Sequence, residues 1–245
     1  MQLPHSHYAY AALQESKSLL SAGLPCWIGD LNWVIAHLPG QNLVNVHVES
    51  MNREELFNLQ VDLERSCDRF LQNFIDTSSK CVLLRGRLET VGGSKRVHVT
   101  RKLRNYLAMP LIPAHRRALT SIMLSTHGLA VERLRFQERY RAPVPHAWRL
   151  CRFCRLEVED EVHALLKCEG SMELLALRLT FRRDVIDIVG NVPWRIDLLE
   201  QLLDLLHDHR LTVRMAKYVY DVLETFTNVP MFIPAPHLYS PLTDA

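Results

Sequence analysis

The chain is organised around residues 151–168, CRFCRLEVEDEVHALLKC. Three thiols and one imidazole recur there in the pattern Cys-x2-Cys-x8-His-x4-Cys, contributed by Cys151, Cys154, His163 and Cys168. Thiolate sulfur and imidazole nitrogen are the donors of closed, tetrahedral zinc sites. With four such donors in so short a segment, the pattern predicts a structural Zn²⁺ site that has no open position for a catalytic water.

The spacing also predicts the local backbone. Cys-x2-Cys places two sulfurs on one tight turn, and the acidic run that follows suits the positive end of a helix that contains His163. Cys168 is five residues beyond His163, which is not a same-face spacing in an α-helix. We therefore expect the helix to end or loosen around Lys167, so that the Cys168 sulfur reaches the same ion.

Two other interpretations of the cluster stay open. The cysteines and the histidine can be unrelated buried residues, or Cys151 and Cys154 alone can form a redox Cys-x-x-Cys pair. The redox interpretation lacks a strand-to-helix context and leaves His163 and Cys168 unexplained. The spacing of all four residues favours the metal site.

Composition restricts the class of protein. The chain has 245 residues, 48% of them hydrophobic, which is enough for a folded core. No apolar run is long enough for a membrane span, and residues 1–10 lack the pattern of a secretory signal. Cys26, Cys67 and Cys81 are scattered rather than arranged as a disulfide framework. We expect an intracellular protein, nuclear or cytoplasmic, that does not contact a membrane.

Charge is unevenly distributed along the chain. Residues 1–94 have 7 basic and 10 acidic side chains, residues 95–155 have 14 and 2, and residues 156–245 have 8 and 15. A middle segment with a balance of +12 is typical of a surface that binds a polyanion. The alternative is that this segment pairs with the acidic C-terminal third of the same chain.

The apolar periodicity predicts a mainly α fold: a helical assembly with a small Cys-Cys-His-Cys zinc module and one short β-hairpin. Alternation on both sides of Gly92-Gly93 predicts the hairpin, and we expect Trp27 and Trp33 to be core aromatics. The expected helices span residues 8–22, 31–38, 52–74, 100–108, 114–126, 172–189, 194–207 and 211–227.

Pro110 and Pro113 suggest a boundary between modules. We expect a helical N-terminal region at 1–109, which contains the hairpin, and C-terminal helices at 191–227. The four prolines that follow predict an extended or disordered tail at 228–245. Residues 110–190 then form the zinc-binding module.

Residues 115–120, HRRALT, followed by RLCRFC at 149–154 and EVEDEVHALLKC at 157–168, form a recognisable series. It resembles the zinc-binding module found C-terminal to reverse transcriptases of non-LTR retrotransposons, in particular the fungal versions. The resemblance covers roughly residues 110–190. It implies that Cys151, Cys154, His163 and Cys168 hold zinc. It also implies that the chain is a C-terminal fragment of a retroelement polyprotein, with residues 1–109 as a thumb- or linker-like remnant.

RNA or DNA is the expected partner, together with the parent reverse transcriptase polyprotein, and no small-molecule substrate is expected. The candidate nucleic-acid-binding residues are Arg116, Arg117, Arg133, Arg135, Arg139, Arg141, Arg149, Arg152 and Arg155. Phe136, Tyr140, Trp148 and Phe153 are candidates for stacking on unpaired bases.

Catalytic motifs are not evident in the sequence. The Tyr/Phe-x-Asp-Asp pair of a two-metal polymerase is missing, since Tyr220-Asp221 lacks the second aspartate. We therefore expect a non-enzymatic, nucleic-acid-binding module. A zinc-stabilised structural or protein-interaction module is the main alternative, and a hydrolase with an unrecognised site is a weaker one.

Overall fold

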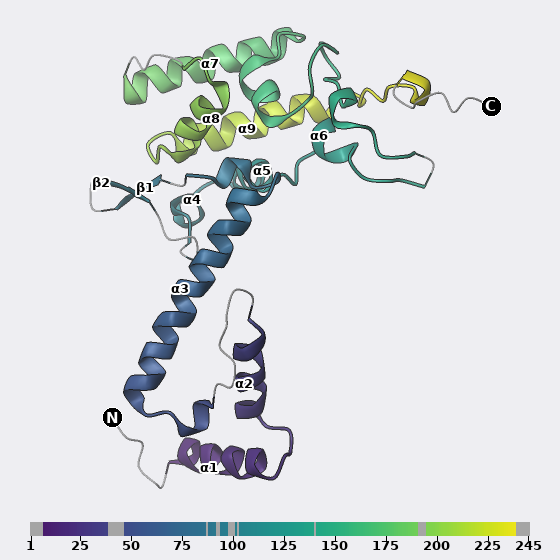
Figure 1. The fold of residues 1–245 in the computed structure, drawn as a ribbon. Helices are drawn as coiled ribbons and strands as arrows, with labels where there is room; N and C mark the ends of the chain where they lie inside the picture. The colour runs from purple at the N-terminus through teal and green to yellow at the C-terminus, as the bar shows by residue number, and fades with distance from the viewer. Residues whose placement is uncertain are drawn as a thin grey trace, which may run out of the picture. The chain divides into compact units, whose positions relative to one another are not determined.

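The computed structural model describes residues 7–38, 47–86, 88–91, 94–97, 101, 103–139, 141–190 and 195–238. Within these ranges the chain is mainly helical, as predicted (Figure 1). It forms two compact units, one from Met1–Phe74 with Val99–Arg101 and the other from Ile75–His98 with Lys102–Ala245. No helix of the described part is both long and apolar enough to cross a membrane.

The first unit contains α1 (Tyr8–Ser21), α2 (Trp27–His37), a 3₁₀ turn at Val48–Ser50 and most of α3 (Arg53–Thr77). Asn52 caps α3, because its side-chain oxygen accepts from the backbone N–H groups of Glu54 and Glu55. Glu55 in turn accepts from the Asn52 N–H, which completes a capping box.

The expectation that Trp27 and Trp33 are core aromatics is wrong. They are 54% and 62% exposed, and the buried positions of α2 are Ile28 and Ile35 instead. The helix begins four residues earlier than the pattern 31–38 indicated, because Cys26 caps it through its sulfur and Gly29 N–H. Ile28 and Ile35 are seven residues apart and define the buried face of α2, and the two indole rings lie off that face.

The second unit begins with the end of α3 and contains the remaining elements. They are β1 (Leu88–Val91), β2 (Ser94–Val97), α4 (Asn105–Ala108), α5 (Pro113–Met123), α6 (Ala130–Arg133), a π-helix at His163–Lys167, α7 (Met172–Val189), α8 (Leu198–His207) and α9 (Thr212–Thr227). Short 3₁₀ turns lie at Val82–Leu84, His146–Trp148 and Pro236–Leu238. β1 and β2 are antiparallel with Leu88 opposite Val97, which is the predicted hairpin.

Helix α9 is central to this unit, and α5, α7, α8 and the π-helix all contact it (Figure 1). Its buried residues repeat at helical spacing and include Met215, Val219, Val222 and Phe226. Helices from both sides of residue 190 thus share one hydrophobic core. The boundaries predicted at 109 and 190 stay predictions, but residues 110–190 pack as part of a larger unit.

The arginine-rich segment after α5 has little regular structure. Among its described residues, Ala130–Arg133 is α-helical and His146–Trp148 forms a 3₁₀ turn before the first cysteine. The expected helix at 100–108 is confined to Asn105–Ala108, and residues 100 and 102 lie outside the described residues.

The C-terminal tail was expected to be extended or disordered. Asn228 and Val229 form a turn at the end of α9, residues 230–235 have no regular secondary structure, and a 3₁₀ turn follows at Pro236–Leu238. This segment also makes specific contacts. Pro234 is buried, and Met231 packs beside Val144. The remainder, residues 239–245, lies outside the described residues.

Candidate metal centre

The structure brings together the four residues that the sequence singled out. One donor atom from each of Cys151, Cys154, His163 and Cys168 lies within 4.8 Å of the others. The sulfurs of Cys151 and Cys168 are 3.6 Å apart, and the Cys154 sulfur is 3.3 Å from His163 Nε2. The group is therefore close enough to hold a metal ion.

The first two ligands lie on a tight turn. The Cys151 N–H donates to the Glu157 carbonyl at 2.8 Å, and the Arg155 N–H donates to the Cys151 carbonyl at 2.9 Å. Arg155 has a φ of 56°, in the left-handed region, which reverses the chain directly after Cys154. The turn points both thiols to one side, as Cys-x2-Cys requires.

The other two ligands lie at the ends of the π-helix His163–Lys167. The Cys168 N–H donates to the His163 carbonyl at 2.8 Å, a bond that spans five residues. The wider turn brings Cys168 back over His163, which an α-helical turn would not do for residues five apart. This is the loosening around Lys167 that the spacing predicted.

Two side chains from other helices support the π-helix. Arg178 of α7 donates to the Leu165 carbonyl at 3.2 Å and to the Cys168 carbonyl at 2.9 Å. The buried Tyr218 hydroxyl of α9 also donates to the Leu165 carbonyl. Sequence reasoning missed both residues, because neither lies near the cysteines in the sequence.

Gly170 allows the segment after Cys168 to pass against the Cys-x2-Cys turn. A Cβ at this position would lie 2.6 Å from the Cys154 backbone nitrogen and 2.8 Å from the Phe153 carbonyl carbon. Both are backbone atoms, so a side chain at position 170 would force the segment after Cys168 away from the Cys-x2-Cys turn. The glycine is a positioning residue that the spacing of ligands does not reveal.

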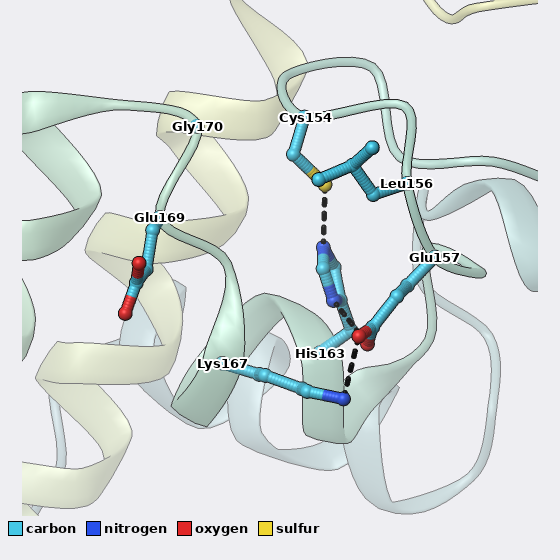
Figure 2. A pocket seen from close by; sticks show the side chains of 7 residues that line it. All are labelled: Cys154, Leu156, Glu157, His163, Lys167, Glu169 and Gly170. Carbon is cyan, nitrogen blue, oxygen red and sulfur yellow. Dashed lines mark hydrogen bonds and ion pairs between the residues drawn. The ribbon is translucent and has the colours of Figure 1, made fainter.

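Glu157 orients the imidazole. His163 Nδ1 lies 3.3 Å from a Glu157 carboxylate oxygen, while Nε2 faces the Cys154 sulfur (Figure 2). The other oxygen of Glu157 pairs with Lys167 at 2.6 Å. A carboxylate that accepts from the second ring nitrogen fixes the tautomer and leaves Nε2 free to bind a metal.

The titration of the donors reflects their proximity. The hydrogen bond with Cys168, together with burial, raises the pKa of the Cys151 thiol to about 12, and the same bond lowers the pKa of Cys168. Burial acts to lower the pKa of His163. Hydrogen bonds with Cys151 and Cys154, and the negative charges of these two residues, outweigh burial and raise the pKa of His163 to about 9. The donors thus compete for protons in a confined site, and a bound cation would displace them.

The donor set fits a tetrahedral ion and does not fit a disulfide. Two sulfurs on one tetrahedral ion at about 2.3 Å each are about 3.8 Å apart, close to the separation of Cys151 and Cys168. A disulfide bond is about 2.05 Å long, and all three cysteines are free thiols here. Cys151, Cys168 and His163 are buried, and Cys154 is partly exposed.

Arg149 and Arg152, which were predicted to contact nucleic acid, have structural roles. The Arg149 guanidinium donates to the carbonyls of Val144 and Val131, each at 2.9 Å. Arg152 is buried and pairs with the fully buried Glu159. Placing Arg152 on a nucleic-acid surface was therefore a mistake. Arg152 also donates to the carbonyls of Phe226 and Val229, which lie too far along the chain for the sequence to have shown these contacts.

The remaining arginines lie at or near the surface. Arg117, Arg133, Arg139 and Arg155 are exposed, and Arg155 stacks over the Phe232 ring. Arg116, Arg135 and Arg141 are half-buried: Arg116 donates to the Met109 carbonyl, and the other two pair with Glu132 and Glu138. The exposed Phe136 ring lies beside Arg135 and Lys80. Tyr140 lies outside the described residues.

A second polar group lies close by. Glu161 accepts from the Ser125 hydroxyl at 3.2 Å and contacts His127 Nε2 at 2.8 Å. Ser125 also lies within hydrogen-bonding distance of the Lys80 carbonyl, at 2.9 Å. A nucleophilic serine needs the imidazole beside its hydroxyl, whereas here the carboxylate stands between them. The contacts join the segment that follows α5 to the helical turn that precedes His163 instead.

Comparison with known proteins gave no match to a family model, to a curated protein or to a solved structure.

Proposed function

We propose that the centre holds a structural Zn²⁺ ion. Three thiolates and one imidazole are the donor set of closed zinc sites, and the sulfur-rich character disfavours the hard cations Mg²⁺ and Ca²⁺. Four donor atoms would surround the ion as a tetrahedron: the sulfurs of Cys151, Cys154 and Cys168, and Nε2 of His163. Glu157 contacts the other imidazole nitrogen, Nδ1. A filled tetrahedron leaves the ion no vacant position, so its contribution is to stability.

The ion would link segments that lie on both sides of the acidic run 157–161. It joins the Cys-x2-Cys turn to the π-helix, and the π-helix is bonded to α7 and α9 through Arg178 and Tyr218. The loop between Arg133 and Cys151 begins and ends on this assembly. Zinc would therefore hold the arginine-bearing loop against a rigid helical core.

We further propose that this chain is a non-catalytic, nucleic-acid-binding module of a retroelement reverse transcriptase polyprotein. The observation that carries the proposal is the exposure of Arg117, Arg133, Arg139 and Arg155 in a segment with a charge balance of +12. Arginine forks suit phosphate oxygens, and the exposed Phe136 ring offers a stacking surface for an unpaired base.

A salt titration tests this proposal. Zinc-loaded protein is titrated with structured RNA and with duplex DNA at low and moderate salt. Binding through several phosphates gives an affinity that falls steeply as salt rises. Neutralising Arg133 and Arg139 with glutamine should weaken binding to all sequences and reduce the salt slope by about 1 to 2.

The matched control neutralises Arg182 and Arg183, two exposed arginines on α7 outside the basic segment. It removes the same charge and should leave the affinity nearly unchanged. Equal losses in the two variants would indicate a general charge effect and not a binding surface. No binding by the parent protein at low salt would overturn the proposal.

One observation favours a protein-interaction module as the second candidate. Met172, Leu179 and Ile186 are exposed on α7 at heptad spacing, with exposed fractions of 80%, 56% and 45%. In that case the zinc centre would hold α7 in place for a protein partner. A chain that fails the nucleic-acid titration but associates through this stripe would support the second candidate.

A further inference from the structure

A cavity of about 540 Å³ opens beside the metal centre (Figure 2). Its lining residues are Cys154, Leu156, Glu157, His163, Lys167, Glu169 and Gly170. Cys154 lines the cavity, whereas the sulfur-bearing residues Cys151 and Cys168 are only 0% and 1% exposed. The centre is thus closed as a coordination site but accessible at one of its three sulfurs.

The charge around the cavity restricts what can enter it. Glu157 and Glu169 are negative and Lys167 is positive, and Lys167 is already paired with Glu157 at 2.6 Å. The remaining Glu169 charge gives the lining a net negative balance, and a centre with three thiolates and one Zn²⁺ adds another negative charge. Small neutral reagents should therefore reach the Cys154 sulfur more readily than anionic ones.

We propose that Cys154 is an oxidation site, at which a small neutral peroxide entering this cavity converts the centre into a disulfide and releases the metal. The inference rests on the proposed zinc ion for the release step. The accessibility of the Cys154 sulfur does not depend on which metal is bound.

The reaction is balanced as two steps. The Cys154 thiolate attacks hydrogen peroxide, so that an S–O bond forms, the O–O bond breaks and hydroxide leaves. A second cluster thiolate, from Cys151 or Cys168, then attacks the Cys154 sulfur and displaces a second hydroxide. Two electrons pass from the sulfurs to the peroxide, and the two hydroxides take up protons to become water.

The cluster geometry suits the second step. All donor atoms lie within 4.8 Å of one another, so a resolving thiolate is already adjacent when the sulfenic acid forms. The disulfide removes two of four ligands, and the remaining thiolate and imidazole are too few for a closed site. Arg155, which follows Cys154 in a left-handed conformation, then loses the turn that positions it.

The experiment uses the full chain with Cys26, Cys67 and Cys81 replaced by serine, so that the thiols outside the cluster do not react. The Cys26→Ser change keeps a capping side chain at the start of α2. Zinc content is measured first. The protein then receives one equivalent of hydrogen peroxide, with released zinc followed by a chromogenic chelator and disulfides mapped by mass spectrometry.

The expected result is one zinc released per disulfide, with Cys154 present in every disulfide found. In a parallel arm, neutral iodoacetamide should label Cys154 before the other two cysteines and faster than anionic iodoacetate. The Glu169→Gln variant should reduce the difference in labelling rate between the two reagents, because only the reaction of Cys154 with iodoacetate becomes faster. Glu169 is exposed, so the change should not affect folding.

Two results would overturn the inference. They are a Cys151–Cys168 disulfide as the first product, and retention of zinc by protein in which Cys154 is oxidised. A third result would contradict the proposed zinc ion without contradicting the accessibility of the Cys154 sulfur. Protein that contains no zinc before treatment, yet still labels first at Cys154, would contradict the proposed metal while supporting the accessible sulfur.

Discussion

The Arg152 guanidinium lies against the Glu159 carboxylate inside the core, with Nη2 and Oε1 2.7 Å apart. Glu159 also accepts from the backbone N–H groups of Ala130 and Arg152, each at 2.8 Å. The other arginine nitrogen, Nη1, donates to the carbonyls of Phe226 and Val229 at 2.5 and 2.9 Å. A residue between the first two cysteines thus joins the metal centre to the end of α9.

Removal of Arg152 should be strongly destabilising. Arg152→Ala leaves the Glu159 carboxylate buried without its counter-charge, and it removes the guanidinium donor to the carbonyls of Phe226 and Val229. Breaking one side of a buried ion pair costs about 3–5 kcal/mol. Chemical denaturation monitored by circular dichroism should show this loss in the free energy of unfolding.

Arg155→Ala is the matched control for Arg152→Ala. Arg155 is three residues away and exposed, with its guanidinium over the Phe232 ring. Its loss should cost about 1 kcal/mol or less, in the range of an exposed cation–π contact. If both variants lost equal stability, the ion pair would not have the structural role assigned to it.

Metal removal should unfold the region around the centre. With the proposed zinc ion in place, residues 151–170 would depend on it to hold the turn against the π-helix. Structural zinc contributes about 10–16 kcal/mol of binding free energy in small zinc-finger peptides. We expect a chelator to lower the melting temperature and to abolish the protection of the Cys168 amide from hydrogen exchange. Restoring zinc should reverse both effects.

The Cys154→Ser variant should reproduce the effect of the chelator, with lower zinc content and lower thermal stability. Cys67→Ser is its control, since Cys67 is exposed on α3 and remote in sequence from the cluster. Unchanged zinc content and melting temperature in Cys154→Ser would contradict the assignment of Cys154 as a ligand.

Gly170→Ala should damage the metal centre without changing a ligand. The added Cβ would lie 2.6 Å from the Cys154 backbone nitrogen, so the turn or the following segment must move. We expect weaker zinc binding in a competition titration with a chelator of known affinity. Gly128→Ala is the control, because a Cβ there meets nothing within 4 Å. Equal zinc affinity in both variants would show that the close approach is not required.

The clustering of Cys151, Cys154, His163 and Cys168 was predictable because it depends on local spacing. Cys-x2-Cys implies a turn, and the five-residue spacing from His163 to Cys168 required the helix to end or loosen around Lys167. The π-helix His163–Lys167 is the form that this loosening takes. The long amphipathic helices were likewise predictable, since α7 has the predicted residues and α9 begins one residue later.

The parts that could not be predicted depend on long-range contacts. Arg152 lies in the basic segment and was therefore expected to contact nucleic acid. Its carbonyl partners, Phe226 and Val229, are 74 and 77 residues away. Gly170 looks like an ordinary loop glycine until the Cys154 backbone is placed beside it. The same holds for Arg178, whose bonds to the π-helix carbonyls depend on how α7 packs.

Glu157 provides the last prediction, because it contacts the imidazole and not the ion. Its carboxylate fixes the His163 tautomer with Nε2 directed to the cluster. Glu157→Gln keeps the size of the side chain but removes the charge that favours an N–H on Nδ1. Such outer contacts are worth about 10–100-fold in metal affinity. We expect zinc affinity to fall within that range while the protein, saturated with zinc, keeps its helical content.

Glu169→Gln is the matched control, because Glu169 lines the same cavity and its substitution changes the same charge while leaving the contact between Glu157 and His163 in place. A general electrostatic effect would weaken zinc binding equally in both variants, since each loses one negative charge near the ion. A loss confined to Glu157→Gln would show that orientation of the imidazole is what the carboxylate contributes. Unchanged zinc affinity in Glu157→Gln would contradict that role and leave Glu157 as the partner of Lys167 alone.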